Sequence, residues 1–234
     1  MSDPAREERS HRDGVRAVAP LAIAVVGFGV SYGVLARAAG MGVLAPIVMS
    51  MTTFAGSAQF AAASILDVGG TVAAAITAAV LLNARYGPIG VSVAPWLTGS
   101  TLSRFLHAQL TVDESWAVAA EGDGRFNPQV LLGAGVTLYA AWVVGTVLGV
   151  AFGDVIGDPS TWGLDAAFPA LFLALLVPQL RDRRAKEAAI LGAGIALVLT
   201  PFTPAGVPII AAAGACLLGL LDRPTARTDE GSAT

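Results

Sequence analysis

The chain has 234 residues, of which 55% are hydrophobic and only 13% are charged, and its net charge is −3. A soluble domain normally carries roughly a quarter charged residues, so this composition excludes an ordinary water-soluble domain and indicates an integral membrane protein. Nucleic-acid binding would need a basic face with aromatic platforms, whereas most basic residues here lie in groups typical of the cytoplasmic flanks of membrane spans.

Seven uncharged runs follow one another along the chain. A spanning helix needs about 20 apolar residues, so the runs predict an all-α integral membrane protein, a polytopic bundle of about six to seven transmembrane segments. We expect residues 1–16 to form a cytoplasmic N-terminal tail, 17–221 the transmembrane domain with a basic cytoplasmic loop at 104–125, and 222–234 a C-terminal tail. The runs are Ala17–Ala36, Ala38–Leu66, Val68–Ala84, Tyr86–Ser103, Phe126–Gly153, Ala166–Leu180 and Ala188–Leu221.

The first four runs lie between two basic segments, which both belong on the cytoplasmic side, so an even number of crossings must separate them. In one solution all four runs cross, and Arg85 lies in an outer turn beside Gly87 and Pro88. In the other, one helix is broken or re-entrant and Arg85 lies at depth, where irregular backbone needs protein or a water-filled cavity beside it. The Gly-, Pro- and Ser-rich run 86–103 makes a poor independent span, which favours the second solution.

A second irregular place is the segment MSMTTFAGSAQF, residues 49–60, which puts hydroxyls, a glycine and an amide into an apolar run. At helical spacing Thr52, Gly56 and Gln59 share one face. Small residues there would also serve close helix packing alone. A buried Gln59 amide must still find hydrogen-bond partners on other helices or on a ligand.

The second half of the chain predicts a simpler arrangement. No Lys or Arg occurs from Phe126 to Leu180, and acidic residues at 154, 158 and 165 interrupt the two runs, so this interruption should face away from the cytoplasm. The last run predicts a helical hairpin bent at Pro201, Pro204 and Pro208.

Four segments together resemble one known family. The segment at residues 49–60 is followed by LLNARYGP, by TVDESWAVA and by LDAAFPALFLALLVP, in the order and with the content of the AzlC family of branched-chain amino acid permeases. FAGSAQF is the most specific piece. Asn83, Arg85 and Tyr86 match the family's Asn-x-Arg-aromatic element, and Asp113 and Glu114 match its acidic pair.

The resemblance implies a transporter of the cytoplasmic membrane that exports leucine, isoleucine, valine or analogues together with a small hydrophobic AzlD-type subunit. Ser57, the backbone near Gly56, and Gln59 are our candidates for binding the substrate carboxylate at a broken helix. Phe54 is a candidate for the aliphatic side chain. Asn83, Arg85 and Tyr86 complete the candidate site.

Arg85 and Asn83 point about 200° apart on a regular helix, so both line one cavity only if the helix breaks. If it does not, Asn83 and Tyr86 form the cavity face, and Arg85 reaches outward or pairs with an acid.

Uphill export needs an energy source, and no phosphate-binding loop occurs, so an ion or proton gradient is expected. Asp67 is a candidate proton carrier, although its neighbours Gly69 and Gly70 are typical of a loop. Asp113 and Glu114 are candidates for gating or coupling, and Thr111 with Glu114 also fits a helix capping box.

We expect no cofactor, no metal and no enzymatic activity, because the sequence contains no G-x-S-x-G elbow and no H-E-x-x-H. The rival interpretations are a passive channel or a structural membrane subunit, which the 27 glycines would suit by close helix packing, and, with less support, an intramembrane enzyme.

Overall fold

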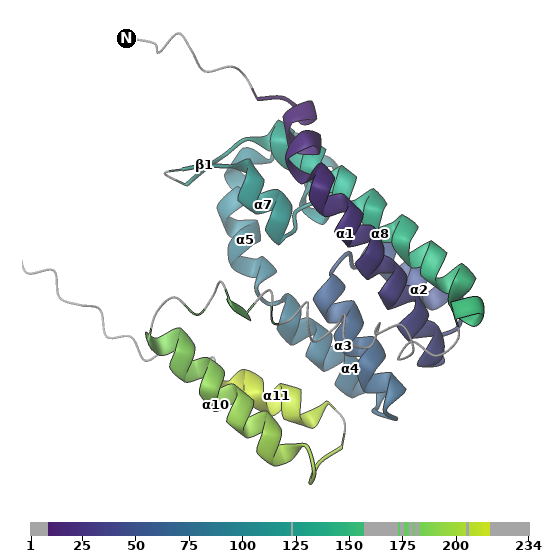
Figure 1. Ribbon diagram of the computed structural model, residues 1–234. Helices are drawn as coiled ribbons and strands as arrows, with labels where there is room; N and C mark the ends of the chain where they lie inside the picture. The colour runs from purple at the N-terminus through teal and green to yellow at the C-terminus, as the bar shows by residue number, and fades with distance from the viewer. Residues whose placement is uncertain are drawn as a thin grey trace, which may run out of the picture.

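The computed structural model describes residues 9–122, 124–156, 173, 176–177, 180, 183–204 and 206–215, and within them the chain is mostly helical (Figure 1). The first half holds one long helix and several short ones. The elements are α1 (His11–Ala38), α2 (Leu44–Thr52), α3 (Gly56–Asp67), α4 (Val72–Asn83), α5 (Tyr86–Val93), η1 (Ala94–Trp96), α6 (Thr101–Gln109), α7 (Asp113–Ala119), β1 (Ala120–Gly122), β2 (Arg125–Phe126), α8 (Pro128–Ile156), α10 (Arg183–Leu199) and α11 (Val207–Ala213).

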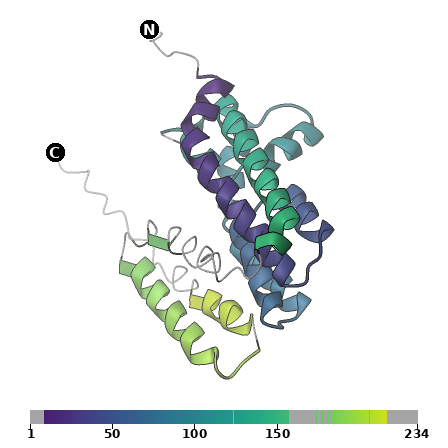
Figure 2. The same cartoon turned by 45° about the vertical axis from the view of Figure 1, so that its right-hand side comes forward.

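The two longest helices, α1 and α8, lie along each other and form the spine of the molecule (Figures 1 and 2). Gly29 and Gly33 of α1 face Gly145 and Gly149 of α8. A Cβ atom on Gly149 would lie 2.2 Å from the Val30 carbonyl oxygen, and one on Gly33 would lie 2.6 Å from a backbone oxygen of α8. Small residues four apart on both helices therefore let the two backbones touch, as is common between membrane helices.

Two described helices are long and apolar enough to cross a membrane, namely His11–Ala38 and Pro128–Gly153. α4 with α5 and η1 passes the same test as one segment bent by 41°. The predicted six to seven spans are not confirmed. The run from Ala38 to Leu66 is divided into α2 and α3, of nine and 12 residues, and at ~1.5 Å per residue neither reaches the ~30 Å of a bilayer core.

The segment 104–125, which we expect to be a basic cytoplasmic loop, contains regular secondary structure within the described residues. It contains most of α6, all of α7, and strand β1, which pairs antiparallel with β2 across Gly122 and Gly124, both with positive φ. The all-α prediction is therefore wrong for this small hairpin. α7 packs against α1 and α8, so this segment reaches the spine of the molecule.

The C-terminal hairpin has the predicted form within the described residues: α10 runs to Leu199, and α11 begins at Val207 beyond a turn that contains Pro201 and Pro204. α11 packs against α4, and a Cβ on Gly206 would lie 2.9 Å from Ala74 Cβ. The predicted span 166–180 lies largely outside the described residues, and the predicted tail 222–234 lies entirely outside them.

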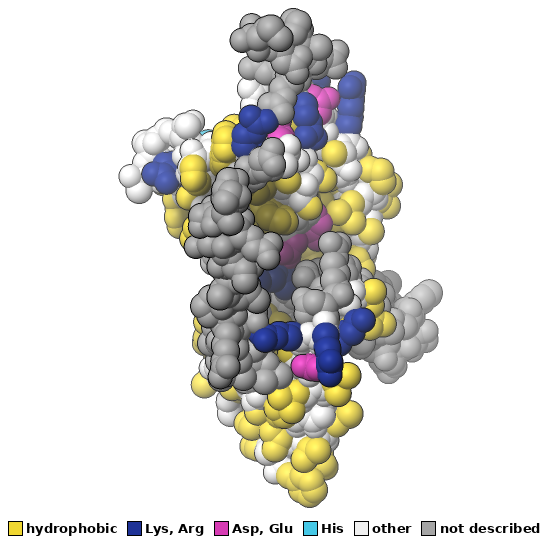
Figure 3. Space-filling view, turned by 90° about the vertical axis from the view of Figure 1, so that its left-hand side faces the viewer, with side chains coloured by type: hydrophobic (Ala, Val, Ile, Leu, Met, Phe, Trp, Pro, Cys, Tyr) yellow, Lys and Arg dark blue, Asp and Glu magenta, His cyan; other side chains and the backbone are white. Residues whose placement is uncertain are grey.

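Large apolar side chains cover much of the outer surface. Ile23 of α1, Val91 of α5, Ile190 and Leu197 of α10, and Phe202 are each more than 70% exposed. In Figure 3 apolar side chains cover much of the face shown, while basic side chains form separate groups. Such extensive apolar exposure suits contact with lipid rather than water.

Candidate functional site

Residues from two helix breaks and from α7 meet in one cavity of about 240 Å³ beside the spine. We call it the charged cavity. Its volume lies just below the ~300–1,000 Å³ typical of ligand pockets, which suits a molecule smaller than a drug. It is lined by Leu21, Val25, Phe28, Phe54, Gly56, Ser57, Arg85, Tyr86, Val112, Asp113, Glu114, Leu138 and Trp142.

The first break separates α2 from α3. Phe54 has a φ of 43°, which is unusual for a residue with a side chain, and its ring packs edge-on against Tyr139 with 5.1 Å between ring centroids. The chain then enters α3 at Gly56, where an added Cβ would lie 3.1 Å from the Trp142 ring. The break therefore brings the N-terminus of α3 to the cavity wall.

The N-terminus of α3 presents backbone N–H groups and a buried hydroxyl to the charged cavity. The first N–H groups of any helix have no acceptor within the helix, and they carry partial positive charge. The N-cap residue of α3, Ala55, has no capping side chain, and its own N–H donates to Gln59 Oε1. Ser57 in its first turn is 2% exposed, and its hydroxyl has no hydrogen-bond partner among the described residues. A ligand with a negative group would satisfy these donors.

The second break lies between α4 and α5 and contains Arg85. Its Nη2 atom lies 3.0 Å from Asp113 Oδ2 and donates a hydrogen bond to the Tyr86 hydroxyl over 3.3 Å. The guanidinium carbon lies 5.0 Å from the Tyr86 ring centroid. Arg85 Nε is buried without a hydrogen-bond partner in the described part of the chain. Arg85 therefore has donor capacity that its protein contacts leave unused.

The acidic pair stands at the start of α7. The Val112 N–H before it donates to Ser115 Oγ over 2.9 Å, so the cap is formed by Ser115 and not by the predicted Thr111 and Glu114. Asp113 and Glu114 both line the cavity. Burial raises the pKa of Glu114, while a backbone N–H and Arg85 act in the opposite direction.

Gln59, a predicted substrate ligand, lies behind the cavity and is fully buried. Its Oε1 accepts from Trp142 Nε1 over 3.0 Å and from the Ala55 N–H over 3.3 Å, and its Nε2 donates to Ser50 Oγ over 2.8 Å. The Ser50 hydroxyl also forms a hydrogen bond of 2.8 Å with Thr146 Oγ1, and the Thr146 hydroxyl donates to the Trp142 carbonyl. The Gln59 amide therefore holds Trp142, whose ring lines the cavity.

Two other predicted residues lie elsewhere. Asn83 lines a separate apolar groove of about 640 Å³ formed mainly by α2, α3 and α4, and its Oδ1 is buried without a partner among the described residues. Asp67 is exposed at the end of α3. The helix does break beside Asn83, yet the break directs Arg85 and Asn83 into different cavities.

The sequence analysis missed the apolar wall. Leu21, Val25 and Phe28 line the cavity from α1, and Leu138 and Trp142 line it from α8. Their spacings of three and four residues were visible as one helical face. That pattern does not distinguish a cavity wall from ordinary packing.

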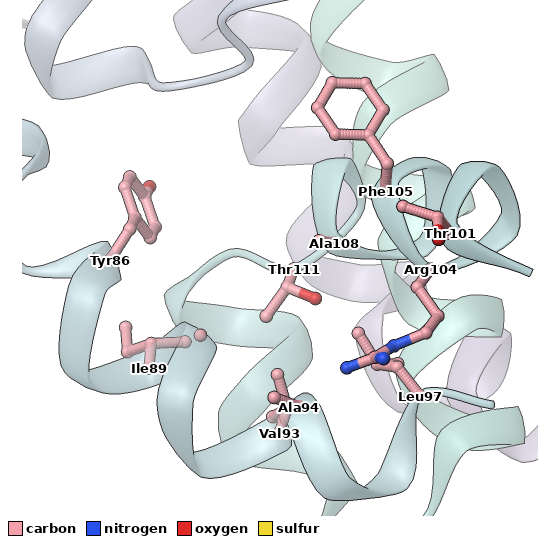
Figure 4. Close-up of a pocket in the computed structure, with 11 residues that line it drawn as sticks. Tyr86, Ile89, Val93, Ala94, Leu97, Thr101, Arg104, Phe105, Ala108 and Thr111 are labelled. Atoms are coloured by element: carbon pink, nitrogen blue, oxygen red, sulfur yellow. The ribbon is translucent and has the colours of Figure 1, made fainter.

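A second cavity of about 490 Å³ adjoins the charged cavity, and Tyr86 lines both. It lies between α5, η1 and α6. Figure 4 shows Tyr86 on one side and Arg104 on the other, with the Arg104 guanidinium directed into the space between them. Among the described residues, no group of three or more His, Cys, Asp or Glu side chains is arranged to hold a metal ion.

Apolar helices long enough to span a bilayer, helix breaks, and a cavity lined by charges of both signs define a membrane protein with the features of a transporter. The profile of the AzlC protein family matches residues 20–156. The chain belongs to the AzlC family, as the resemblance in its sequence predicted.

Three relatives show the range of similarity. An "Uncharacterized membrane protein" of Archaeoglobus fulgidus is 33% identical over 83% of this chain and 86% of its own length. The "Branched-chain amino acid transport protein AzlC" of Bacillus subtilis is 26% identical over 72% of this chain and 67% of its own. "Inner membrane protein YgaZ" of Escherichia coli is 23% identical over 93% of both. No solved structure matches the chain.

Proposed function

We propose that this chain is the transport subunit of a secondary exporter of branched-chain amino acids, and that the charged cavity binds the substrate. The observation that carries the proposal is the combination in one small cavity of a cation, two acids, an uncapped helix N-terminus and an apolar wall. An amino acid zwitterion has a carboxylate, an ammonium and a side chain, and the cavity offers a partner for each. The name of the Bacillus subtilis relative supports the same substrate class.

The carboxylate partners are the N-terminus of α3, the Ser57 hydroxyl and Arg85. Ser57 Oγ and Arg85 Nε are both buried polar atoms without hydrogen-bond partners among the described residues. A carboxylate between them would accept charge-assisted hydrogen bonds, which are roughly twice as strong as neutral ones. Discontinuous helices bind anionic substrate groups in this way in other transporters.

The ammonium partners are Asp113 and Glu114. The sequence analysis gave this pair a role in gating or coupling, and the cavity adds a direct role in binding, because both side chains line it. An ion or proton gradient remains our proposed energy source. Glu114 is the better candidate for carrying the proton, because burial raises its pKa, whereas Asp67 lies exposed outside the cavity.

The aliphatic side chain would lie against the apolar wall. Val25 and Phe28 from α1 and Leu138 from α8 face the cavity together with the Trp142 ring. These side chains suit a branched hydrocarbon and cannot bind a charged or amide side chain without leaving it unpaired. Gln59 acts here by holding Trp142 in place and not by touching the substrate.

The cavity between α5 and α6 would be the path to this site, with Tyr86 at the boundary and Arg104 at its far side. The setting we propose is the inner membrane with a cytoplasmic N-terminus, and the E. coli relative's name supports that membrane. We also propose the small AzlD-type subunit as partner, on the strength of the family resemblance.

The test is efflux of preloaded labelled leucine, isoleucine and valine from cells that express the chain with and without its small partner. Ser57→Ala and Arg85→Ala should lower efflux, and Glu187→Gln, which changes an exposed ion pair on α10, should not. Saturable efflux lost in the cavity variants supports the exporter. Non-saturable leakage would indicate a channel, and efflux of none of the three would overturn the proposal.

A further inference from the structure

An ion pair already occupies the charged cavity. Arg85 and Asp113 lie 3.0 Å apart, and their side chains are 32% and 31% exposed, so both are accessible from the cavity and neither is fully hydrated. Glu114 lines the same cavity beside them. The charges that a zwitterion would need are therefore present but bonded to each other.

We propose that the substrate binds by exchanging this ion pair, so that the site accepts only molecules that carry both a free ammonium and a free carboxylate. The substrate carboxylate takes Arg85, and its ammonium takes Asp113 with Glu114. The inference rests on the proposed function, and it adds a rule for which aliphatic molecules are accepted.

The rule follows from charge balance. A zwitterion replaces one ion pair with two and leaves the net charge of the cavity unchanged. A molecule with only a carboxylate would take Arg85 and leave Asp113 as a desolvated charge without its partner, and a molecule with only an ammonium would do the reverse. Leaving one member of such a pair uncompensated is strongly unfavourable, so we expect single-charge analogues to bind roughly 100-fold more weakly than leucine.

Three features of the cavity suit such an exchange. Arg85 retains an unsatisfied Nε donor, and its present contact with Tyr86 is a single bond of 3.3 Å. Gly56 and Ser57 at the α3 N-terminus line the same cavity, so the substrate carboxylate meets hydrogen-bond donors besides Arg85. Asp113 shares the cavity with Glu114, so a substrate ammonium that replaces Arg85 meets a second carboxylate there.

The rule also predicts how specificity changes when one charge is removed. In Asp113→Asn, Arg85 loses its closest acid, so a carboxylate without an ammonium no longer leaves that acid unpaired. Isocaproate, which is leucine without its amino group, should gain at least about tenfold relative to leucine. In Arg85→Gln the gain should pass to isoamylamine, which is leucine without its carboxylate.

The experiment measures two things on the full-length chain with its partner: inhibition of labelled leucine counterflow in liposomes, and thermal stabilisation in detergent by leucine, isocaproate and isoamylamine. Glu187→Gln is the matched control, because it also removes a carboxylate but lies on the exposed face of α10. The wild-type comparison of the three ligands needs no variant and stands even if one variant does not fold.

The expected result is discrimination against both analogues by the wild-type protein and opposite shifts in the two variants. Isocaproate that competes as well as leucine in the wild-type protein would overturn the exchange while leaving the exporter intact, as would variants that shift in the same direction. Stabilisation by leucine but not by the analogues, without leucine transport, would support the exchange and overturn the export. Neither binding nor transport of leucine would overturn both.

Discussion

The two helix breaks of this chain treat their polar groups in opposite ways. At the break between α2 and α3 the polar side chain, Gln59, is fully buried and bonded to Trp142, Ser50 and the Ala55 N–H. At the break between α4 and α5 the polar side chain, Arg85, faces a cavity, and its Nε has no hydrogen-bond partner among the described residues. The difference teaches that a polar residue inside a membrane protein indicates a binding site only when the protein itself leaves its hydrogen bonds unmade.

The hydrogen bonds around Gln59 begin and end at Trp142. Trp142 donates to Gln59, Gln59 donates to Ser50, and Thr146 returns the chain of hydrogen bonds to the Trp142 carbonyl. Such chains polarise one another and fix a unique arrangement of helices when every member is satisfied. The Gln59 network at the first break is therefore structural: it holds the Trp142 wall of the cavity that Arg85 of the second break also lines.

The strongest test of this contrast is Arg85→Ala. Removing one member of a partly buried ion pair typically costs 2–5 kcal/mol, so we expect leucine transport to fall by about 100-fold or more. Arg85→Lys should restore only part of the activity, because an ammonium cannot make the bidentate contact. Efflux assays at matched membrane levels check both, and a fully active lysine variant would show that carboxylate geometry does not require the guanidinium.

Gln59→Leu should instead act first on stability. The Trp142 and Ala55 N–H groups lose their acceptor inside the protein, which should cost about 2–4 kcal/mol of unfolding free energy, and transport should fall with it. Gln59→Ala should abolish leucine export while the chain still inserts. Thermal unfolding in detergent measures the loss of stability of the Gln59→Leu protein relative to the wild-type protein.

Thr77→Val is the matched control for Gln59→Leu, because it removes an exposed hydroxyl that bonds only to the carbonyl of its own helix at Ala73. The midpoint of thermal unfolding of the Thr77→Val protein should stay near that of the wild-type protein. A Gln59→Leu protein as stable as this control would mean that the first break does not depend on its amide, and the contrast between the breaks would fail.

Local sequence patterns predicted the elements better than their meeting points. The apolar runs overlap α1, α8 and the C-terminal hairpin. A spanning helix can be recognised in a sequence by its length and apolar composition. The Gly- and Pro-rich composition after Arg85 favoured a broken helix over an outer turn, and α4 and α5 are bent by 41° at this place. Six to seven spans were expected, because hydropathy alone does not show where an apolar run is divided into two short helices.

The site was predicted in part for the same reason. The family motifs named Phe54, Ser57, Arg85 and the acidic pair, all of which line the charged cavity. The motifs did not show that Arg85 bonds to Asp113. These residues are 28 positions apart and lie on different elements, whose relative placement is set by the tertiary fold. Gln59 was predicted to bind the substrate because the sequence around it does not show its hydrogen-bond partners. Among them, Trp142 lies on α8.

A smaller effect on leucine binding is expected at Ser57. This residue distinguishes a role in substrate binding from a role in stability at the first break. Its hydroxyl has no partner in the described protein, so Ser57→Ala removes no bond that holds the fold, and stability should change little. Loss of one hydrogen bond to a bound carboxylate should cost about 1 kcal/mol, or roughly fivefold in apparent affinity for leucine. Counterflow titration against the wild-type protein measures it, and a destabilised Ser57→Ala protein with unchanged affinity would reverse the assignment.

The smallest effect concerns pH at the charged cavity, where Glu114 of α7 lies near Arg85 of the second break. Burial raises the pKa of Glu114 above its ordinary value of 4.5, so the folded protein holds this proton more tightly than the unfolded chain does. This group therefore contributes stability below pH 4.5 that is lost as the pH rises through the folded-state pKa, and Glu114→Gln should flatten that part of the stability profile.

The same proton bears on the contrast between the breaks. An ionised Glu114 adds negative charge beside the Arg85–Asp113 pair, whereas a protonated one leaves the pair electrically balanced, so leucine affinity in Glu114→Gln should also become less dependent on pH. A variant with flattened stability but an unchanged pH profile of leucine binding would place Glu114 in the fold and outside the exchange. Both curves flattened together would mean that the substrate directly meets the charge of Glu114, beside the Arg85 of the second break and away from the uncharged Gln59 network of the first.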